Sequence, residues 1–181
     1  MKKIVLAATI AALGSTQAFA KDMAIESNPL GLAIGLLNGS FVYDVTDTIS
    51  VGPTLSYWSF DLGTDDKYTY LNLGGRVEVM PKGNDESGLY IAGSVNRASF
   101  SVDSTDGSLT CEASVSALGA TATGGYKFIS AGGFIAKVGA GYGLGTAGNL
   151  TGSCSDNSEY DESADLPFGG LAFEWTLGYK F

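Results

Sequence analysis

The chain has 181 residues, 10 Lys and Arg against 19 Asp and Glu, a formal net charge of −9 and no His. The acidic balance excludes nucleic-acid binding, which rests on clustered Lys and Arg, and the absence of His removes the commonest general base and metal ligand. Apolar residues make up 45% and charged residues 16% of the chain. That is too hydrophobic for a disordered chain, and the charged fraction is below the roughly 25% of soluble domains.

The N-terminus is typical of an export signal. Two lysines precede an apolar stretch, and Ala18 and Ala20 stand at the two positions that a signal peptidase reads. The stretch is shorter than the roughly 20 residues that a membrane-spanning helix needs. We therefore expect residues 1–20 to be a cleaved signal peptide and residues 21–181 to form a single exported domain, in a compartment where disulfides persist.

The first mature segment, residues 24–46, alternates apolar and polar side chains in two phases. One phase contains Leu30, Leu32, Ile34 and Leu36, and the other contains Phe41, Tyr43 and Val45. A bulge in one long strand would cause the change, and so would a tight turn at Leu37-Asn38-Gly39, because Asn-Gly is a hairpin signal. We predict the hairpin, which makes the total number of strands even.

The rest of the chain contains six further segments with period-two alternation, the pattern of β-strands. They cover residues 49–61, 67–80, 88–101, 114–128, 133–146 and 167–181. Together with the hairpin they predict an all-β fold, an antiparallel up-and-down barrel of eight strands. Both termini then lie at the same end of the barrel, which is the periplasmic end.

The polarity of the two strand faces indicates the solvent. A soluble barrel would expose a face of Gly, Ala and Thr with few charges, whereas an outer-membrane barrel turns its apolar face to lipid. The connections at 46–48 and 130–132 are short, as periplasmic turns are, and 81–88 is long for such a turn and fits less well. Residues 102–113 and 147–165 are long, polar and acidic, as extracellular loops are. We predict a monomer in the outer membrane of a Gram-negative bacterium, in contact with its lipid and lipopolysaccharide.

The last strand carries apolar side chains at alternate positions up to the chain end, Trp175, Leu177, Tyr179 and Phe181. On these residues the chain resembles the eight-stranded outer-membrane barrels of the OmpA/OmpX-like superfamily. The resemblance implies that the four residues form the signal read by the barrel-assembly machinery. It implies little about activity, because the superfamily includes structural proteins, adhesins and lipid-modifying enzymes. The enzymes on such barrels resemble one another in using an essential His, which this chain lacks.

Cys111 and Cys154 lie in the two long connections, on the same side of the predicted barrel. We predict a disulfide between them, worth about 4 kcal/mol in the chain-entropy model. The alternatives are two free thiols or metal ligation, and two Cys without His or a C-x-x-C spacing make a poor metal site. The segment 154–165 also carries Asp156, Glu159, Asp161, Glu162 and Asp165. We interpret this segment as a solvated acidic loop, with a Ca²⁺ or Mg²⁺ site as the alternative.

Several charged side chains fall on the luminal strand faces. They are Arg76, Glu78, Lys127, Lys137, Glu174 and Lys180, with Asp44 as a further candidate. Because buried charges must pair, we predict a luminal ion-pair network with Glu78 and Glu174 as its acceptors.

An eight-stranded barrel has room only for its own side chains or for one small ligand. We therefore predict a plugged, non-enzymatic protein without cofactor or metal, with a structural role or a surface role toward an extracellular protein or ligand. The alternative is a narrow porin-like channel or small-ligand carrier, because many luminal glycines could leave space. A lipid-modifying enzyme that uses a Lys-activated Ser is a remote alternative.

Overall fold

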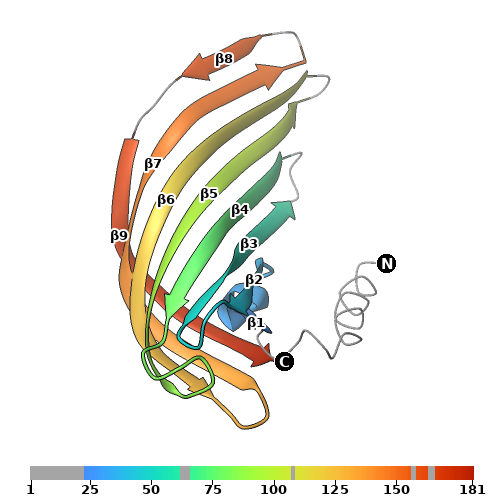
Figure 1. Cartoon of the computed structure of the whole chain (residues 1–181). Helices are drawn as coiled ribbons and strands as arrows, with labels where there is room; N and C mark the ends of the chain where they lie inside the picture. The colour runs from blue at the N-terminus through green and yellow to red at the C-terminus, as the bar shows by residue number, and fades with distance from the viewer. Residues whose placement is uncertain (1–22, 62–65, 107–108, 156–157, 163–165) are drawn as a thin grey trace.

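The structure is a computed structural model that describes residues 23–61, 66–106, 109–155, 158–162 and 166–181. Its strands are β1 (Met23–Ser27), β2 (Leu37–Asp44), β3 (Ile49–Asp61), β4 (Asp66–Val79), β5 (Gly88–Asp106), β6 (Leu109–Ile129), β7 (Phe134–Cys154), β8 (Glu159–Glu162) and β9 (Leu166–Lys180). All pairings are antiparallel, β7 pairs with β9, and β9 closes the sheet on β1 (Figure 1). Because β8 pairs only with the end of β7, the closed ring has eight strands, as predicted.

The ring turns its apolar face outward. Along β9, Leu171 is 78% exposed and Phe173 is 80% exposed, whereas the neighbouring Glu174 points inward. Side chains of this size on a continuous outer face require an apolar environment, which lipid provides. The fold is therefore that of a transmembrane β-barrel. In the described part of the chain, no helix is long and apolar enough to cross a membrane.

The predicted turn at Leu37-Asn38-Gly39 is wrong, because these residues begin β2. The hairpin connection is residues 28–36 and contains a short helix, α2 (Pro29–Ala33). The Asn28 side chain caps the helix by accepting hydrogen bonds from two backbone N–H groups of its first turn, at 2.9 and 3.2 Å. Proline at the first helical position favours this start. The helix, and not a bulge or a two-residue turn, causes the change in alternation phase.

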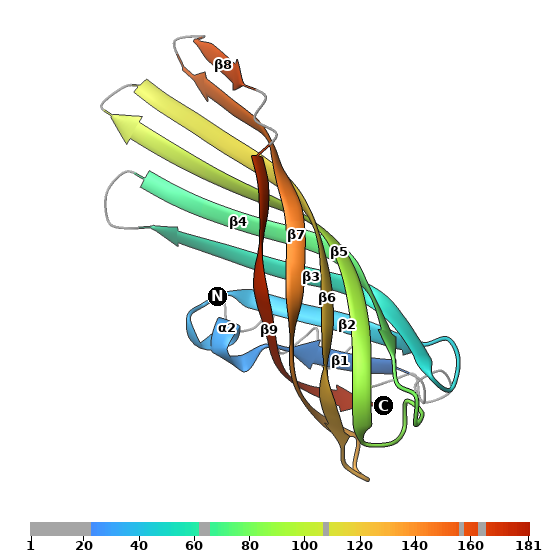
Figure 2. The same cartoon turned by 90° about the vertical axis from the view of Figure 1, so that its left-hand side faces the viewer.

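One end of the barrel carries the short connections and both ends of the described chain (Figure 2). Short turns are periplasmic in outer-membrane barrels, so we name this end the periplasmic end and the opposite one the extracellular end. The longer connection between β4 and β5 folds across the mouth there. The backbone N–H of Asn84 donates to the Asp47 carbonyl at 2.7 Å, and its side chain donates to the Thr46 carbonyl at 2.8 Å. Met80 and Asn84 are buried as a result.

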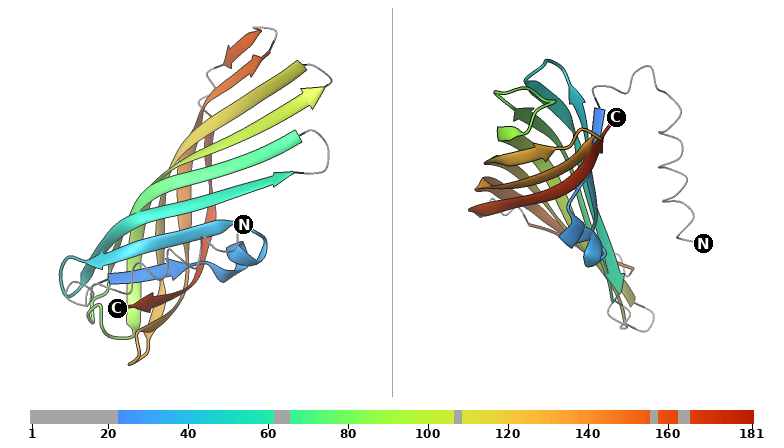
Figure 3. Two further views of the ribbon diagram at one scale, coloured as in Figure 1. Left: turned by 90° about the vertical axis from the view of Figure 1, so that its right-hand side faces the viewer. Right: turned by 90° about the horizontal axis from the view of Figure 1, so that it is seen from below.

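At the opposite end, β4 to β7 continue far beyond β1 and β2 (Figure 3). Pairing persists to Asp106 and Leu109 between β5 and β6, and to Cys111 and Cys154 between β6 and β7. The expectation that residues 102–113 and 147–165 are loops is therefore largely wrong. Polar and acidic composition suggested loops, but the side chains still alternate between two faces, which is what a strand requires.

The predicted signal peptide, with Ala18 and Ala20, lies outside the described residues. Its cleavage stays a prediction.

Candidate functional site

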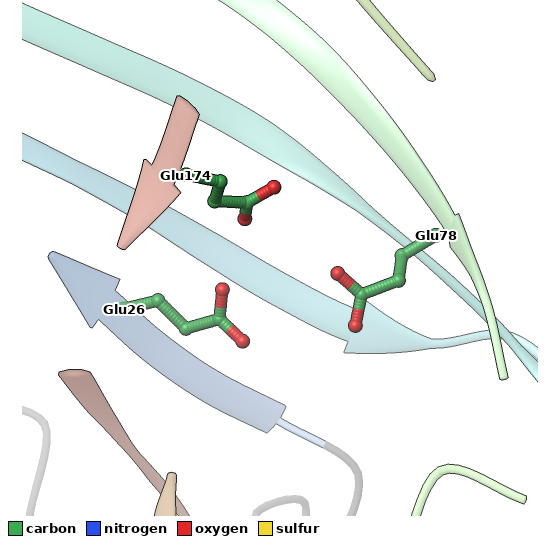
Figure 4. A group of neighbouring side chains, drawn as sticks. All are labelled: Glu26, Glu78 and Glu174. Atoms are coloured by element: carbon green, nitrogen blue, oxygen red, sulfur yellow. The ribbon is translucent and has the colours of Figure 1, made fainter. Parts of the chain in front are cut away.

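The inner faces of five strands bring six charged side chains to one level of the lumen. Three are acidic and three are basic: Glu26 from β1, Arg76 and Glu78 from β4, Lys127 from β6, Lys137 from β7 and Glu174 from β9. Figure 4 shows the three carboxylates, which point toward one another from separate strands. An oxygen of each lies within 4.8 Å of the others. We call these six residues the ion cluster.

Lys137 lies at the centre of the ion cluster. Its Nζ is 2.5 Å from Glu26 Oε2, 2.7 Å from Glu78 Oε2 and 3.4 Å from Glu174 Oε1. The Lys137 side chain has no exposed surface. Its ammonium group therefore lies among the three carboxylates, in the place where a bound cation would be coordinated.

Two further cations complete the ion cluster. Lys127 Nζ is 2.9 Å from Glu78 and 3.2 Å from Glu26. Arg76 bridges Glu78 at 3.0 Å and Glu174 at 2.9 Å. Three formal positive charges thus face three negative ones, and the cluster is neutral as a whole. A buried charge that lost its partner would be strongly destabilising, so these contacts depend on one another.

Tyr90 fills the space beside the ion cluster. Its hydroxyl donates to Glu174 Oε2 at 3.0 Å, and Thr123 donates to the same oxygen at 3.0 Å. The Tyr90 ring also lies 5.3 Å from Lys137 Nζ, within cation–π range. A Cβ at Gly139 would collide with the Tyr90 hydroxyl. This glycine of β7 therefore makes room for the large side chain on β5.

The structure places five of the six predicted luminal residues in the ion cluster and Lys180 elsewhere. Lys180 Nζ lies at the periplasmic mouth, 2.6 Å from Asp44 and 2.6 Å from Asp85. Glu26 was not predicted as an acceptor, because the change of phase in residues 24–46 obscured its face. The sequence signal that could have revealed its inward face was Asn28-Pro29, which ends β1 before the alternation changes phase.

A cavity of about 330 Å³ lies on the extracellular side of the ion cluster. Glu26, Arg76 and Glu174 belong to the ion cluster and also line the cavity, so the cluster forms one wall of the cavity. The other walls carry hydroxyl and amide side chains, among them Ser40, Thr54, Ser56, Asn72, Ser94, Asn96, Thr121 and Thr176. This cavity is polar, yet the charges at its floor are already compensated.

The structure contains the predicted Cys111–Cys154 disulfide, between residues directly opposite each other on β6 and β7. The disulfide joins the strands near the end of their extracellular extension. Asp156 and Asp165 of the predicted acidic loop lie outside the described residues, and Asp161 on β8 is exposed. The solvated acidic loop stays a prediction.

The four residues of the predicted assembly signal alternate along the end of the chain. Their side chains point outward and are partly exposed: Trp175, Leu177, Tyr179 and Phe181. The Tyr179 and Phe181 rings meet edge to face at 5.3 Å. They lie on the lipid-facing surface at the periplasmic end, and their role in assembly stays a prediction.

No protein-family model matches the chain, and no curated protein sequence matches it. Among solved structures, the crystal structure of Acinetobacter baumannii CarO is similar at 11% sequence identity with a TM-score of 0.33. The match covers 92% of this chain and 100% of that chain. At this TM-score, the barrel assignment rests on the strand pairing of the chain itself.

Proposed function

We propose that the chain is a non-enzymatic, monomeric outer-membrane barrel of a Gram-negative bacterium that does not conduct ions and acts at the extracellular surface. The observation that carries this proposal is the position of Lys137, which joins carboxylates from three different strands across the lumen. Because the ion cluster connects opposite walls, it leaves the centre of the barrel occupied by side chains.

A second contact across the barrel, at its periplasmic mouth, supports a lumen that does not conduct ions. The β4–β5 connection reaches from the Thr46 and Asp47 carbonyls on one side to Lys180 on the other, whose Nζ donates to the Asn84 carbonyl at 3.2 Å. An ion that crossed the barrel would have to separate both this contact and the ion cluster. Breaking a buried ion pair costs several kcal/mol, which makes steady conduction unfavourable.

The hydrogen bonds of the lumen support a non-enzymatic role. The Lys127 and Lys137 ammonium groups contact carboxylates, and the nearby Thr123 hydroxyl donates to Glu174. A Lys-activated nucleophile requires the amine to accept a proton from the hydroxyl, which a lysine held in ion pairs does not do. The extracellular extension and its cavity are then the accessible parts of the molecule.

Planar-bilayer recording of the refolded protein tests the proposal. We expect no steady, reproducible openings from the wild-type chain. The double variant Tyr90→Ala/Lys137→Ala serves as the positive control, because it removes two of the largest fully buried side chains and should produce discrete openings. Steady openings of the wild-type protein would refute the closed lumen.

The cavity on the extracellular side favours a second candidate, a small-ligand binding role. Its volume of about 330 Å³ lies within the range of small-molecule sites, about 300–1,000 Å³. This role is compatible with a closed lumen, because a ligand would enter and leave on the extracellular side.

A further inference from the structure

Beyond the membrane-spanning ring, the two faces of the sheet exchange character: the inner face becomes apolar and the outer face becomes polar. On the inner face, the polar residues Ser56 and Asn72 are followed along their strands by Trp58 and Tyr70. On the outer face, the lipid-facing positions of the ring give way to small polar and charged side chains, including Ser59, Asp61, Lys67, Ser101 and Asp103. The extension therefore has a polar outer face, as expected in water, and an apolar inner face.

Four aromatic side chains form a continuous surface on this inner face. The rings of Trp58 and Phe60 lie 4.3 Å apart, Phe60 stacks on Tyr68 at 4.9 Å, and Tyr68 lies 6.3 Å from Phe100. Phe100 is 37% exposed, although it faces the inside of the extension. We call these four residues the aromatic platform. Trp58, Phe60 and Tyr68 are partly exposed, and neighbouring aromatic rings of this kind are a typical surface for an apolar ligand.

The aromatic platform begins one inward-facing pair beyond the cavity. Ser56 pairs with Asn72 in the cavity wall, and the next inward-facing pair is Trp58 with Tyr70. Two residues along a strand span about 7 Å, so the two surfaces meet within the length of one small molecule. The connection that carries α2 also lies there, because a Cβ at Gly35 would be 3.8 Å from the Trp58 indole nitrogen.

Apart from Glu26, whose Oε1 lies 3.2 Å from Lys127 Nζ, three residues that line the cavity have a buried polar atom with no hydrogen-bond partner among the described residues. These atoms are Asn72 Oδ1, Arg76 Nε and Thr176 Oγ1, one acceptor, one donor and one hydroxyl. Buried polar atoms without partners are rare in native proteins and call for an explanation. A hydroxyl group both donates and accepts, so hydroxyl groups of a ligand would pair with these atoms once the side chains that cover them move aside.

We propose that the cavity and the aromatic platform together bind a neutral amphiphile, with an uncharged hydroxyl-bearing head in the cavity and an apolar body on the platform. The inference rests on the proposed function in one respect, namely that the ligand comes from outside and stops at the ion cluster. A charged head is disfavoured because the cluster is neutral. An anion would face Glu26 and Glu174, and a cation would face Arg76.

The chain provides its own reporter for a binding experiment. It contains two tryptophans, Trp58 on the platform and Trp175 on the lipid-facing surface. The variant Trp175→Phe leaves Trp58 as the sole indole. In lipid nanodiscs, titration with octyl glucoside below its micelle concentration should give a saturable change in Trp58 fluorescence. Octanoate and octyltrimethylammonium should bind at least tenfold more weakly.

Matched variants test the two halves of the site in the same background. Phe60→Ser should weaken octyl glucoside binding at least fivefold, whereas Tyr57→Ser, an aromatic-to-serine change on the outer face of the same strand, should leave it unchanged. Ser94→Phe, which fills the cavity, should abolish binding. The heat-induced shift in electrophoretic mobility of folded barrels verifies that each variant is folded.

The inference would be overturned by a fluorescence change that does not saturate, or by equal binding of the neutral and charged amphiphiles. Unchanged affinity in folded Phe60→Ser or Ser94→Phe protein would overturn it as well. The readout does not depend on conductance. Saturable binding by a conducting wild-type barrel would refute only the closed lumen, and absent binding by a silent barrel would refute only the ligand site.

Discussion

The Lys137 ammonium lies 2.7 Å from the Glu78 carboxylate at a place in the lumen where both side chains are buried. Lys137 comes from β7 and Glu78 from β4, on opposite parts of the ring. A pair that crosses the barrel in this way links the stability of the fold to the closure of the lumen. Removal of one partner should therefore affect both properties.

Replacing the central lysine should strongly destabilise the barrel. Lys137→Met leaves three carboxylates with two cations, and an uncompensated buried charge costs about 3–5 kcal/mol. Urea unfolding in detergent, followed by tryptophan fluorescence, measures the loss. Lys67→Met on the exposed outer face of β4 is the matched control and should cost at most about 1 kcal/mol. Equal losses in the two variants would contradict the central role of Lys137.

Removing an acid together with the lysine should restore part of the stability. The double variant Lys137→Met/Glu78→Gln eliminates one positive and one negative charge, so the remaining charges are again balanced. We expect the sum of the two single losses to exceed the loss in the double variant by about 1–3 kcal/mol. A double-mutant cycle measures this coupling. Strict additivity would show that the two side chains stabilise the barrel independently.

The contact between Gly139 and Tyr90 predicts a steric effect with a specific rescue. Gly139→Ala places a methyl group against the Tyr90 hydroxyl and should cost about 1–3 kcal/mol. Gly75→Ala is the control, because a Cβ there would meet nothing within 4 Å. In a Tyr90→Phe background the cost of Gly139→Ala should fall, and an unchanged cost would locate the strain elsewhere.

The disulfide should stabilise the extension more than the ring. In the variant Cys111→Ser/Cys154→Ser, hydrogen exchange measured by mass spectrometry should become faster in residues 109–115 and 150–154. Exchange in the ring segment of β9 should stay unchanged, which makes that strand an internal control. Faster exchange throughout the barrel would mean that the bond stabilises the fold globally. A thiol assay on the wild-type protein should find no free cysteine until it is reduced.

The closed ring of strands could be predicted from the sequence because its signal is local. In β9 and β7, large apolar side chains alternate with Gly, Thr or charged residues over many positions, and only a strand with lipid on one side accommodates that pattern. The inward orientation of the Lys127, Lys137 and Glu174 side chains could be predicted from the same alternation. An ion-pair network could be predicted, but which cation meets which carboxylate could not, because the individual contacts depend on the stagger of strands around the ring.

The two main errors have separate physical causes. Leu30 and its apolar neighbours were interpreted as a strand face, but Asn28 and Pro29 start a helical turn that abolishes the period of two. The extension was interpreted as loops because its composition is polar. Arg97 on β5 shows where this interpretation fails, because it is a charged residue on the outward, apolar face of the ring and lies close to the level where the polarity of the sheet inverts.

Residues far apart in the sequence meet in both sets of luminal ion pairs. Glu26 on β1 binds Lys137 on β7 across 111 positions of sequence, and Lys180, next to the last residue, binds Asp44 on β2 across 136 positions. The pairing of β9 with β1 closes the ring and brings the strands that carry these residues together. A sheet in which that pairing is missing would separate Lys137 from Glu26 and Lys180 from Asp44, although Lys137 could still meet Glu78. We therefore expect these two ion pairs to depend on an intact β1–β9 seam, so that a barrel with an open seam would differ from the closed one in permeability as well as in shape.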